Sequence, residues 1–113
     1  MGNVPLYEAK AELFKTLGHP VRIRALELLQ DGPRPVHELL AEIDIEPSNL
    51  SQQLAVLRRA GLVRSSRTGA AVVYTLATED VADLLLHARR ILAALWSDQK
   101  ELQDSLQDSS GTA

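Results

Sequence analysis

The segment SNLSQQLAVLRRAGLV, residues 48–63, combines the apolar spacing of a helix with a polar face that has no carboxylate. Leu50, Leu54 and Leu57 recur at helical spacing and predict one buried face on a helix that begins at residue 47 or 48 and ends before Gly61. The opposite face carries Ser48, Ser51, Gln52, Ala55, Arg58 and Arg59. This outer face is small and neutral where the helix begins, and it is cationic where the helix ends.

Acidic residues stay absent up to Thr78, although the chain as a whole has a formal net charge of −3 at pH 7. Ser and Gln side chains can hydrogen-bond to base edges in the major groove, and Arg can neutralise phosphate. Carboxylates at these positions would repel the DNA backbone. An ordinary solvated helix face mixes Glu with Lys, and this face has neither. The pattern therefore favours a DNA-binding helix over a merely solvated one.

Three further helices are predicted before this segment. The first covers residues 6–17 and ends at Gly18, and the second runs from about residue 20 to residue 30. The turn at residues 31–35 stops the second helix, and the third begins near Pro35.

The period of the apolar pattern changes after Gly61. Residues 62–65 and 71–76 resemble two short strands with a turn at residues 67–69, so we expect a hairpin with Arg64 and Arg67 beside its turn. A slim cationic tip of this kind fits a minor groove or lies along phosphate. Thr78 then suits the N-cap of a long last helix. This order predicts a winged helix-turn-helix, a mainly α (α+β) fold with a two-stranded β-hairpin wing.

Length and composition exclude several classes of protein. A chain of 113 residues is one domain, predicted to cover residues 1–106 with a disordered tail at 107–113. The chain has no Cys, and this excludes disulfides and thiolate metal sites. No apolar run approaches the roughly 20 residues of a membrane span, and the N-terminus lacks the apolar core of a signal peptide. We expect a cytoplasmic protein without membrane contact. No recognisable spacing of a nucleophile, a base and an orienting group indicates an enzyme.

A chain of this size builds only a thin core, so a partner subunit would help to cover its apolar surface. The first and last predicted helices carry more large apolar side chains than the chain can bury alone. A homodimer interface is therefore predicted at Leu6, Leu13, Leu92, Leu95 and Trp96.

Three stretches together resemble the ArsR/SmtB family of bacterial winged-helix transcriptional regulators: LFKTLGHPVRIRALELL at 13–29, the segment at 48–63, and RTGAAVVYTL at 67–76. The resemblance covers roughly residues 10–95. It implies a homodimer formed by the first and last helices, with the polar helix in the major groove of a palindromic operator. Many relatives have His where this chain has Gln53. The predicted DNA-binding residues are Ser48, Asn49, Ser51, Gln52, Gln53, Arg58, Arg59, Arg64, Arg67 and Thr68.

The sequence leaves the effector of such a regulator open. One family metal site needs Cys, and the positions of another fall on Thr78, Asp80, Ile91 and Ala94, two of which are apolar. Asp80, Asp83 and His87 form a different cluster on the last helix, whose oxygen and imidazole ligands suit Ni(II), Zn(II) or Co(II). The alternative is that these side chains line the solvent edge of the helix, where Asp near the N-terminus is favourable anyway.

A second hypothesis for function also stays open. Winged helices also bind proteins, so the chain could be a protein-interaction subunit of a two-component regulator, with an accessory protein as partner and no effector of its own.

Overall fold

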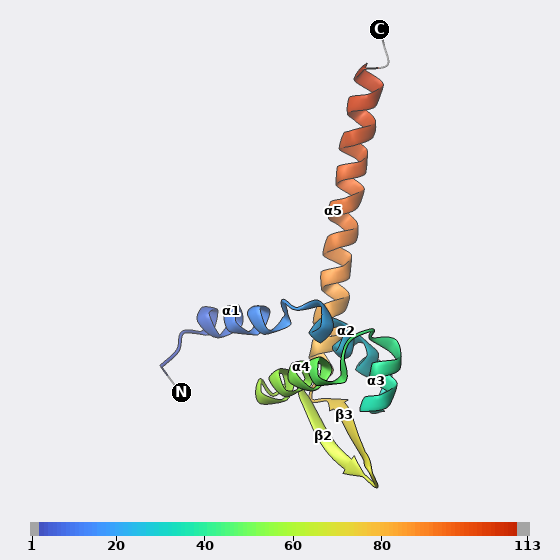
Figure 1. The fold of residues 1–113 in the computed structure, drawn as a ribbon. Helices are drawn as coiled ribbons and strands as arrows, with labels where there is room; N and C mark the ends of the chain where they lie inside the picture. The colour runs from blue at the N-terminus through green and yellow to red at the C-terminus, as the bar shows by residue number, and fades with distance from the viewer. Residues whose placement is uncertain (1–2, 111–113) are drawn as a thin grey trace. The chain divides into compact units, whose positions relative to one another are not determined.

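The computed structural model describes residues 3–110, with side chains described up to Gln107. The helices are α1 (Leu6–Leu17), α2 (Pro20–Leu28), α3 (Val36–Glu42), α4 (Pro47–Arg59) and α5 (Asp80–Ser110), with a 3₁₀ turn η1 (Leu29–Asp31) after α2 (Figure 1). The strands are β1 (Arg34–Pro35), β2 (Val63–Thr68) and β3 (Ala71–Leu76). The chain divides into two compact units, residues 1–82 and residues 83–113. The first unit contains every element except most of α5.

Local signals at the helix ends explain the placement of α2 and α4. His19 caps α2, since its Nδ1 accepts a hydrogen bond from the Val21 backbone N–H at 3.2 Å, and Pro20 takes the first helical position. At the end of α4, Gly61 has a φ of 80°. The Leu62 N–H then bonds to the Leu57 carbonyl at 3.0 Å and the Gly61 N–H to the Arg58 carbonyl at 2.9 Å. This pair of bonds is a Schellman motif, which ends the helix and turns the chain into β2.

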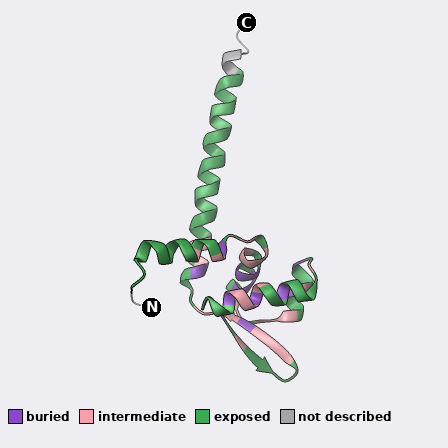
Figure 2. Cartoon of the chain, turned by 60° about the vertical axis from the view of Figure 1, so that its left-hand side comes forward, coloured by how far each residue is buried: buried purple, intermediate pink, exposed green. Residues whose placement is uncertain are grey.

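The core of the first unit is built from aliphatic side chains. Leu50, Leu54 and Leu57 are at most 1% exposed, which confirms the predicted inner face of α4. Leu26 of α2 and Leu39 of α3 are fully buried as well. In Figure 2 the buried positions of this unit lie in its helices and at the base of the hairpin, and the far end of the hairpin has none. The outer face of α4 is thereby fixed in place by its own buried leucines.

The sheet has three strands in the order β1-β3-β2, all antiparallel, whereas the sequence predicted only a two-stranded hairpin. Arg34 and Pro35, assigned to a turn from the sequence, pair with Tyr74 and Val73 of β3. A strand of two residues is too short to show an alternating pattern. Pro35 is tolerated there because β1 lies at the sheet edge, where a missing N–H costs no ladder bond.

The wing hairpin also has a different register from the predicted one. Arg67 pairs with Val72 and Thr68 with Ala71, so the strands extend further and the turn is residues 69–70, not 67–69. Gly69 has a φ of 63°, a conformation that two-residue hairpin turns require and that Gly adopts at low cost. The placement of Arg64 beside the turn is wrong: Arg64 pairs with Thr75, near the base of the hairpin.

The predicted N-cap of the last helix is confirmed, since the Thr78 hydroxyl accepts a hydrogen bond from the Asp80 N–H at 3.2 Å. α5 continues to Ser110, beyond the domain boundary predicted at residue 106. Residues 107–110 of the predicted disordered tail are thus helical, and residues 111–113 lie outside the described residues. Between residues 3 and 110, no helix is both long enough and apolar enough to span a membrane.

Candidate nucleic-acid interface

The outer face of α4 presents a row of polar and cationic side chains to solvent. Ser48, Ser51 and Gln52 are exposed in its first turns, and Arg58 and Arg59 are exposed in its last turn. The arginines lie at the carboxyl end, where the helix dipole favours positive charge. The sequence prediction for the geometry of this face is confirmed, with neutral hydrogen-bonding groups at one end of the helix and positive charge at the other.

The positive charge on α4 and the wing is not neutralised within the chain. Among residues 3–107, whose side chains the structure describes, the ion pair present joins Arg24 to Glu27 at 3.8 Å on α2. No carboxylate in this described part lies within ion-pair distance of Arg58, Arg59 or Arg67. These three guanidinium groups are therefore available to an external anion, and phosphate is one of the anions that Arg binds in a planar, bidentate geometry.

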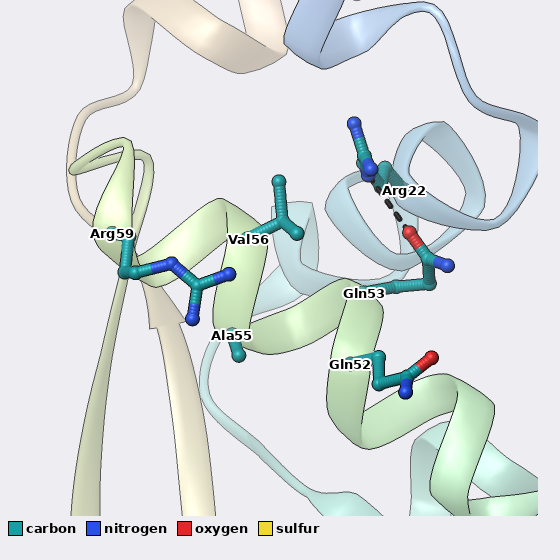
Figure 3. A pocket seen from close by; sticks show the side chains of 6 residues that line it. All are labelled: Arg22, Gln52, Gln53, Ala55, Val56 and Arg59. Carbon is teal, nitrogen blue, oxygen red and sulfur yellow. Dashed lines mark hydrogen bonds between the residues drawn. The ribbon is translucent and has the colours of Figure 1, made fainter.

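Gln53, predicted to lie close to the bases, has a different environment. It is half-buried, and its Oε1 accepts a hydrogen bond from Nε of Arg22 on α2 at 2.8 Å (Figure 3). Arg22 in turn donates through Nη1 to the Thr16 carbonyl at the end of α1, at 3.1 Å. The amide nitrogen of Gln53 donates to Oδ1 of Asn49 at 3.0 Å. Gln53 therefore connects α4 to α2 and fixes the neighbouring Asn49 side chain.

Arg22 is a residue that sequence reasoning missed. It belongs to the HPVR stretch quoted for the family resemblance, but it lies 31 residues from Gln53, and no local spacing links the two. The signal available in the sequence was an Arg on a short predicted helix that is otherwise largely apolar. A guanidinium in such a position needs a hydrogen-bond acceptor, because an unpaired buried charge is costly.

A hollow of about 390 Å³ lies between α2 and α4 beside this network. It is lined by Arg22, Gln52, Gln53, Ala55, Val56 and Arg59. Figure 3 shows the side chains of Gln52 and Arg59 on the α4 side of the hollow and Arg22 across from Gln53. The lining offers amide and guanidinium groups and no carboxylate, so its chemistry matches the rest of the α4 surface.

The wing contributes one cation near its end. Arg67 and Thr68 are exposed next to the turn. Arg64, by contrast, directs Nη2 back to the Ala77 carbonyl at 3.5 Å, at the base of the hairpin. A second hollow, of about 420 Å³, brings Ser51 of α4 together with His37 of α3 and residues 70–72 of the wing. The outer face of α4 and the end of the wing thus adjoin one another.

The predicted metal ligands lie on α5, and all three are exposed. Asp80 and His87 stand seven residues apart, a rise of about 10 Å along a helix. The ligands of one ion all lie within about 2.2 Å of it. Throughout the part of the chain that the structure describes, no group of three His, Asp or Glu side chains could hold a metal ion.

The residues predicted for the dimer interface lie on apolar faces of α1 and α5. Leu6 is 69% exposed, Leu95 51% and Trp96 62%, while Leu92 is less exposed and Leu13 is half-buried. Large apolar side chains that the prediction omitted share these helices, namely Tyr7 and Phe14 on α1 and Ile91, Leu102 and Leu106 on α5. Exposed apolar groups at this density indicate an interaction surface.

The fold defines the winged helix-turn-helix class of DNA-binding proteins. It has three short helices, then the polar helix α4, which packs on the core through its buried leucines, and then a cationic hairpin. Residues 19–65 match the model of the family "Bacterial regulatory protein, arsR family". The chain is 52% identical over 107 residues to Rv0081 of Mycobacterium tuberculosis, an uncharacterized HTH-type transcriptional regulator, covering 94% of both chains. The chain belongs to the ArsR family and is a DNA-binding transcriptional regulator, not an enzyme.

Solved structures agree with this assignment. The crystal structure of Rv0081 matches with a TM-score of 0.78 at 55% identity, covering 86% of this chain and 98% of that one. The solution structure of the homodimeric winged helix-turn-helix domain of Mb0332 from Mycobacterium bovis matches with a TM-score of 0.72 at 26% identity, covering 87% of this chain and 95% of that one. The chain therefore shares its winged-helix fold with Rv0081 and with the Mb0332 domain.

Proposed function

We propose that the protein binds a palindromic DNA operator as a homodimer and thereby controls transcription. The observation that carries the proposal is the exposed, carboxylate-free face of α4, whose arginines have no ion-pair partner in the described chain. In this arrangement the first turns of α4 contact base edges in the major groove, and Arg58 and Arg59 contact phosphate. Such a role places the protein in the cytoplasm, where bacterial DNA lies.

Two observations support the proposed homodimer. The apolar faces of α1 and α5 are exposed in the single chain, and the Mb0332 domain with the same fold is homodimeric. A two-fold symmetric dimer presents two copies of α4 to DNA, so its operator has two half-sites in inverted orientation, about one helical turn apart. Each wing then lies along phosphate or a minor groove beside its half-site.

The roles of α4 and the wing can be separated by two substitutions. Gln52→Ala is expected to weaken operator binding by about 1 to 3 kcal/mol and to leave binding to random DNA nearly unchanged, because Gln52 contacts a base edge. Arg67→Ala is expected to weaken both alike, because a phosphate contact carries no sequence information. Fluorescence anisotropy with an operator fragment and a scrambled fragment of equal length measures both effects.

Arg24→Ala is the matched control for these substitutions, because Arg24 pairs with Glu27 on α2 and takes no part in the proposed interface. It should leave both affinities unchanged. The assignment of roles is wrong if Arg67→Ala changes the preference for the operator while Gln52→Ala leaves it intact.

Modulation by a metal ion stays a prediction from the sequence, and we route no step of DNA binding through it. If Asp80, Asp83 and His87 hold Ni(II) or Zn(II) in the assembled protein, calorimetric titration should show modest affinity in the wild type and none in His87→Ala. Equal heats from both proteins, or no binding by either, would remove these three residues as a metal site. A small molecule or an accessory protein would then be the effector to look for.

A further inference from the structure

The hydrogen bonds between Arg22, Gln53 and Asn49 have a fixed direction. An arginine side chain has only donors, so the Gln53 atom that receives the bond from Arg22 Nε at 2.8 Å must be the carbonyl oxygen. The amide nitrogen of Gln53 is then the atom that faces Asn49, and it can only donate. The atom of Asn49 at 3.0 Å must therefore be its oxygen, Oδ1. The donor-only chemistry of Arg22 thus sets the orientation of both amides.

Arg22 is itself held in place from a second direction. Its Nη1 donates to the Thr16 carbonyl at 3.1 Å, and the residue is half-buried between the end of α1 and α4. Reversing the Gln53 amide would place an NH₂ group against Arg22 and leave two donors facing one another. The arrangement with Oε1 toward Arg22 is therefore the one that pairs a donor with an acceptor at both ends of the Gln53 amide.

We propose that Arg22, acting through Gln53, makes Asn49 a hydrogen-bond donor toward DNA, so that Asn49 selects an acceptor on the base edge. This inference rests on the proposed placement of α4 in the major groove. Asn49 lies in the first turn of α4, and its Oδ1 is already engaged, which leaves the NH₂ group for the base. Guanine O6 and N7, thymine O4 and adenine N7 are acceptors, but adenine also presents its N6 amine, and cytosine presents only the N4 amine there.

The inference also excludes a contact that an unrestrained Asn would favour. Asn commonly pairs with adenine through two bonds, one from its NH₂ to N7 and one to its oxygen from N6. Here the oxygen of Asn49 is turned toward Gln53 and accepts from it, so it does not face the base edge as the two-bond adenine contact requires. Arg22 and Gln53 are accordingly positioning residues, and their effect on specificity is exerted through Asn49.

Gln53→Glu tests the inference directly. A carboxylate still accepts from Arg22 but cannot donate, so Asn49 must turn its NH₂ inward and present Oδ1 to DNA. The preference at one position of each half-site should then shift by about five- to tenfold, from guanine or thymine toward a base with an amino group. The added negative charge should weaken binding to all sequences alike. Competition among operator fragments with all four base pairs at each half-site position measures the shift.

Two further variants complete the experiment, with folding followed by circular dichroism. Asn49→Ala should lose the preference at that same position and at no other. Arg22→Gln, which can donate or accept, should relax the preference and restore the two-bond contact with adenine. If the wild type prefers a base there and Gln53→Glu keeps that preference unchanged, the inference fails while the DNA-binding function stands. An Asn49→Ala variant that keeps the full base preference of the wild type also overturns the inference. Failure of the wild type to bind any fragment would instead overturn the proposed function.

Discussion

Operator affinity is expected to fall about 10³-fold when the salt concentration rises from about 50 mM to about 200 mM. Arg58, Arg59 and Arg67 are exposed and have no ion-pair partner in the described chain. In a dimer, each of these three arginines contacts the DNA in both subunits. Each phosphate contact releases condensed counterions. The logarithm of the binding constant should therefore fall against the logarithm of salt concentration with a slope of roughly −5.

Single substitutions should show how much each arginine contributes to the salt dependence of the binding constant. Arg58→Ala or Arg67→Ala should make the slope less steep by about 2, one phosphate contact for each copy. Arg24→Ala, with its charge paired to Glu27, should leave the slope unchanged. Anisotropy of a labelled operator fragment in a series of salt concentrations gives all the slopes. A flat salt response of the wild type would favour the hypothesis of a protein-interaction subunit.

Leu95→Asp is expected to convert the dimer to a monomer and to lower operator affinity by about 10²- to 10⁴-fold. Leu95 is 51% exposed on α5, in the same stretch as Ile91 and Trp96, which are 61% and 62% exposed. A carboxylate placed in an apolar interface loses its hydration without gaining a partner, so association becomes unfavourable. A monomer engages one half-site only, and the gain from binding two linked half-sites together is lost.

Light scattering at micromolar concentration gives the mass, and anisotropy gives the affinity of the same samples. Ser97→Asp is the matched control, since it adds the same charge two residues further along α5 at a position that was already polar. It should stay dimeric and bind normally. A monomeric wild type, or a Leu95→Asp variant with the mass of a dimer, would contradict the proposed interface.

Elements with a periodic pattern were predictable from the sequence. The bounds of α1 and the buried face of α4 agree with the structure because each repeats apolar residues at helical spacing over several turns. β1 was missed because two residues hold no period. The wing register depended on Gly69, whose positive φ places the turn one to two residues later than the sequence suggested.

The end of α5 was also predicted wrongly, because α5 continues to Ser110 where the sequence indicated a disordered tail from residue 107. A polar composition after residue 98 indicated disorder, but that stretch contains no Gly or Pro before Gly111, and Gln and Leu, which favour helix, recur in it. The sequence predicted those parts of the site whose residues are close together along the chain. The exposed row on α4 follows from its own spacing, whereas the bond from Arg22 to Gln53 joins residues that only the packing of α2 on α4 brings together.

In vitro selection from a randomised DNA library with the wild-type protein tests the central claim most directly. We expect the recovered fragments to share a palindromic consensus with half-sites about one helical turn apart, and we expect Gln52→Ala to lose part of that consensus. Recovery of fragments without any shared sequence, or no retention of DNA at all, would contradict sequence-specific binding by α4.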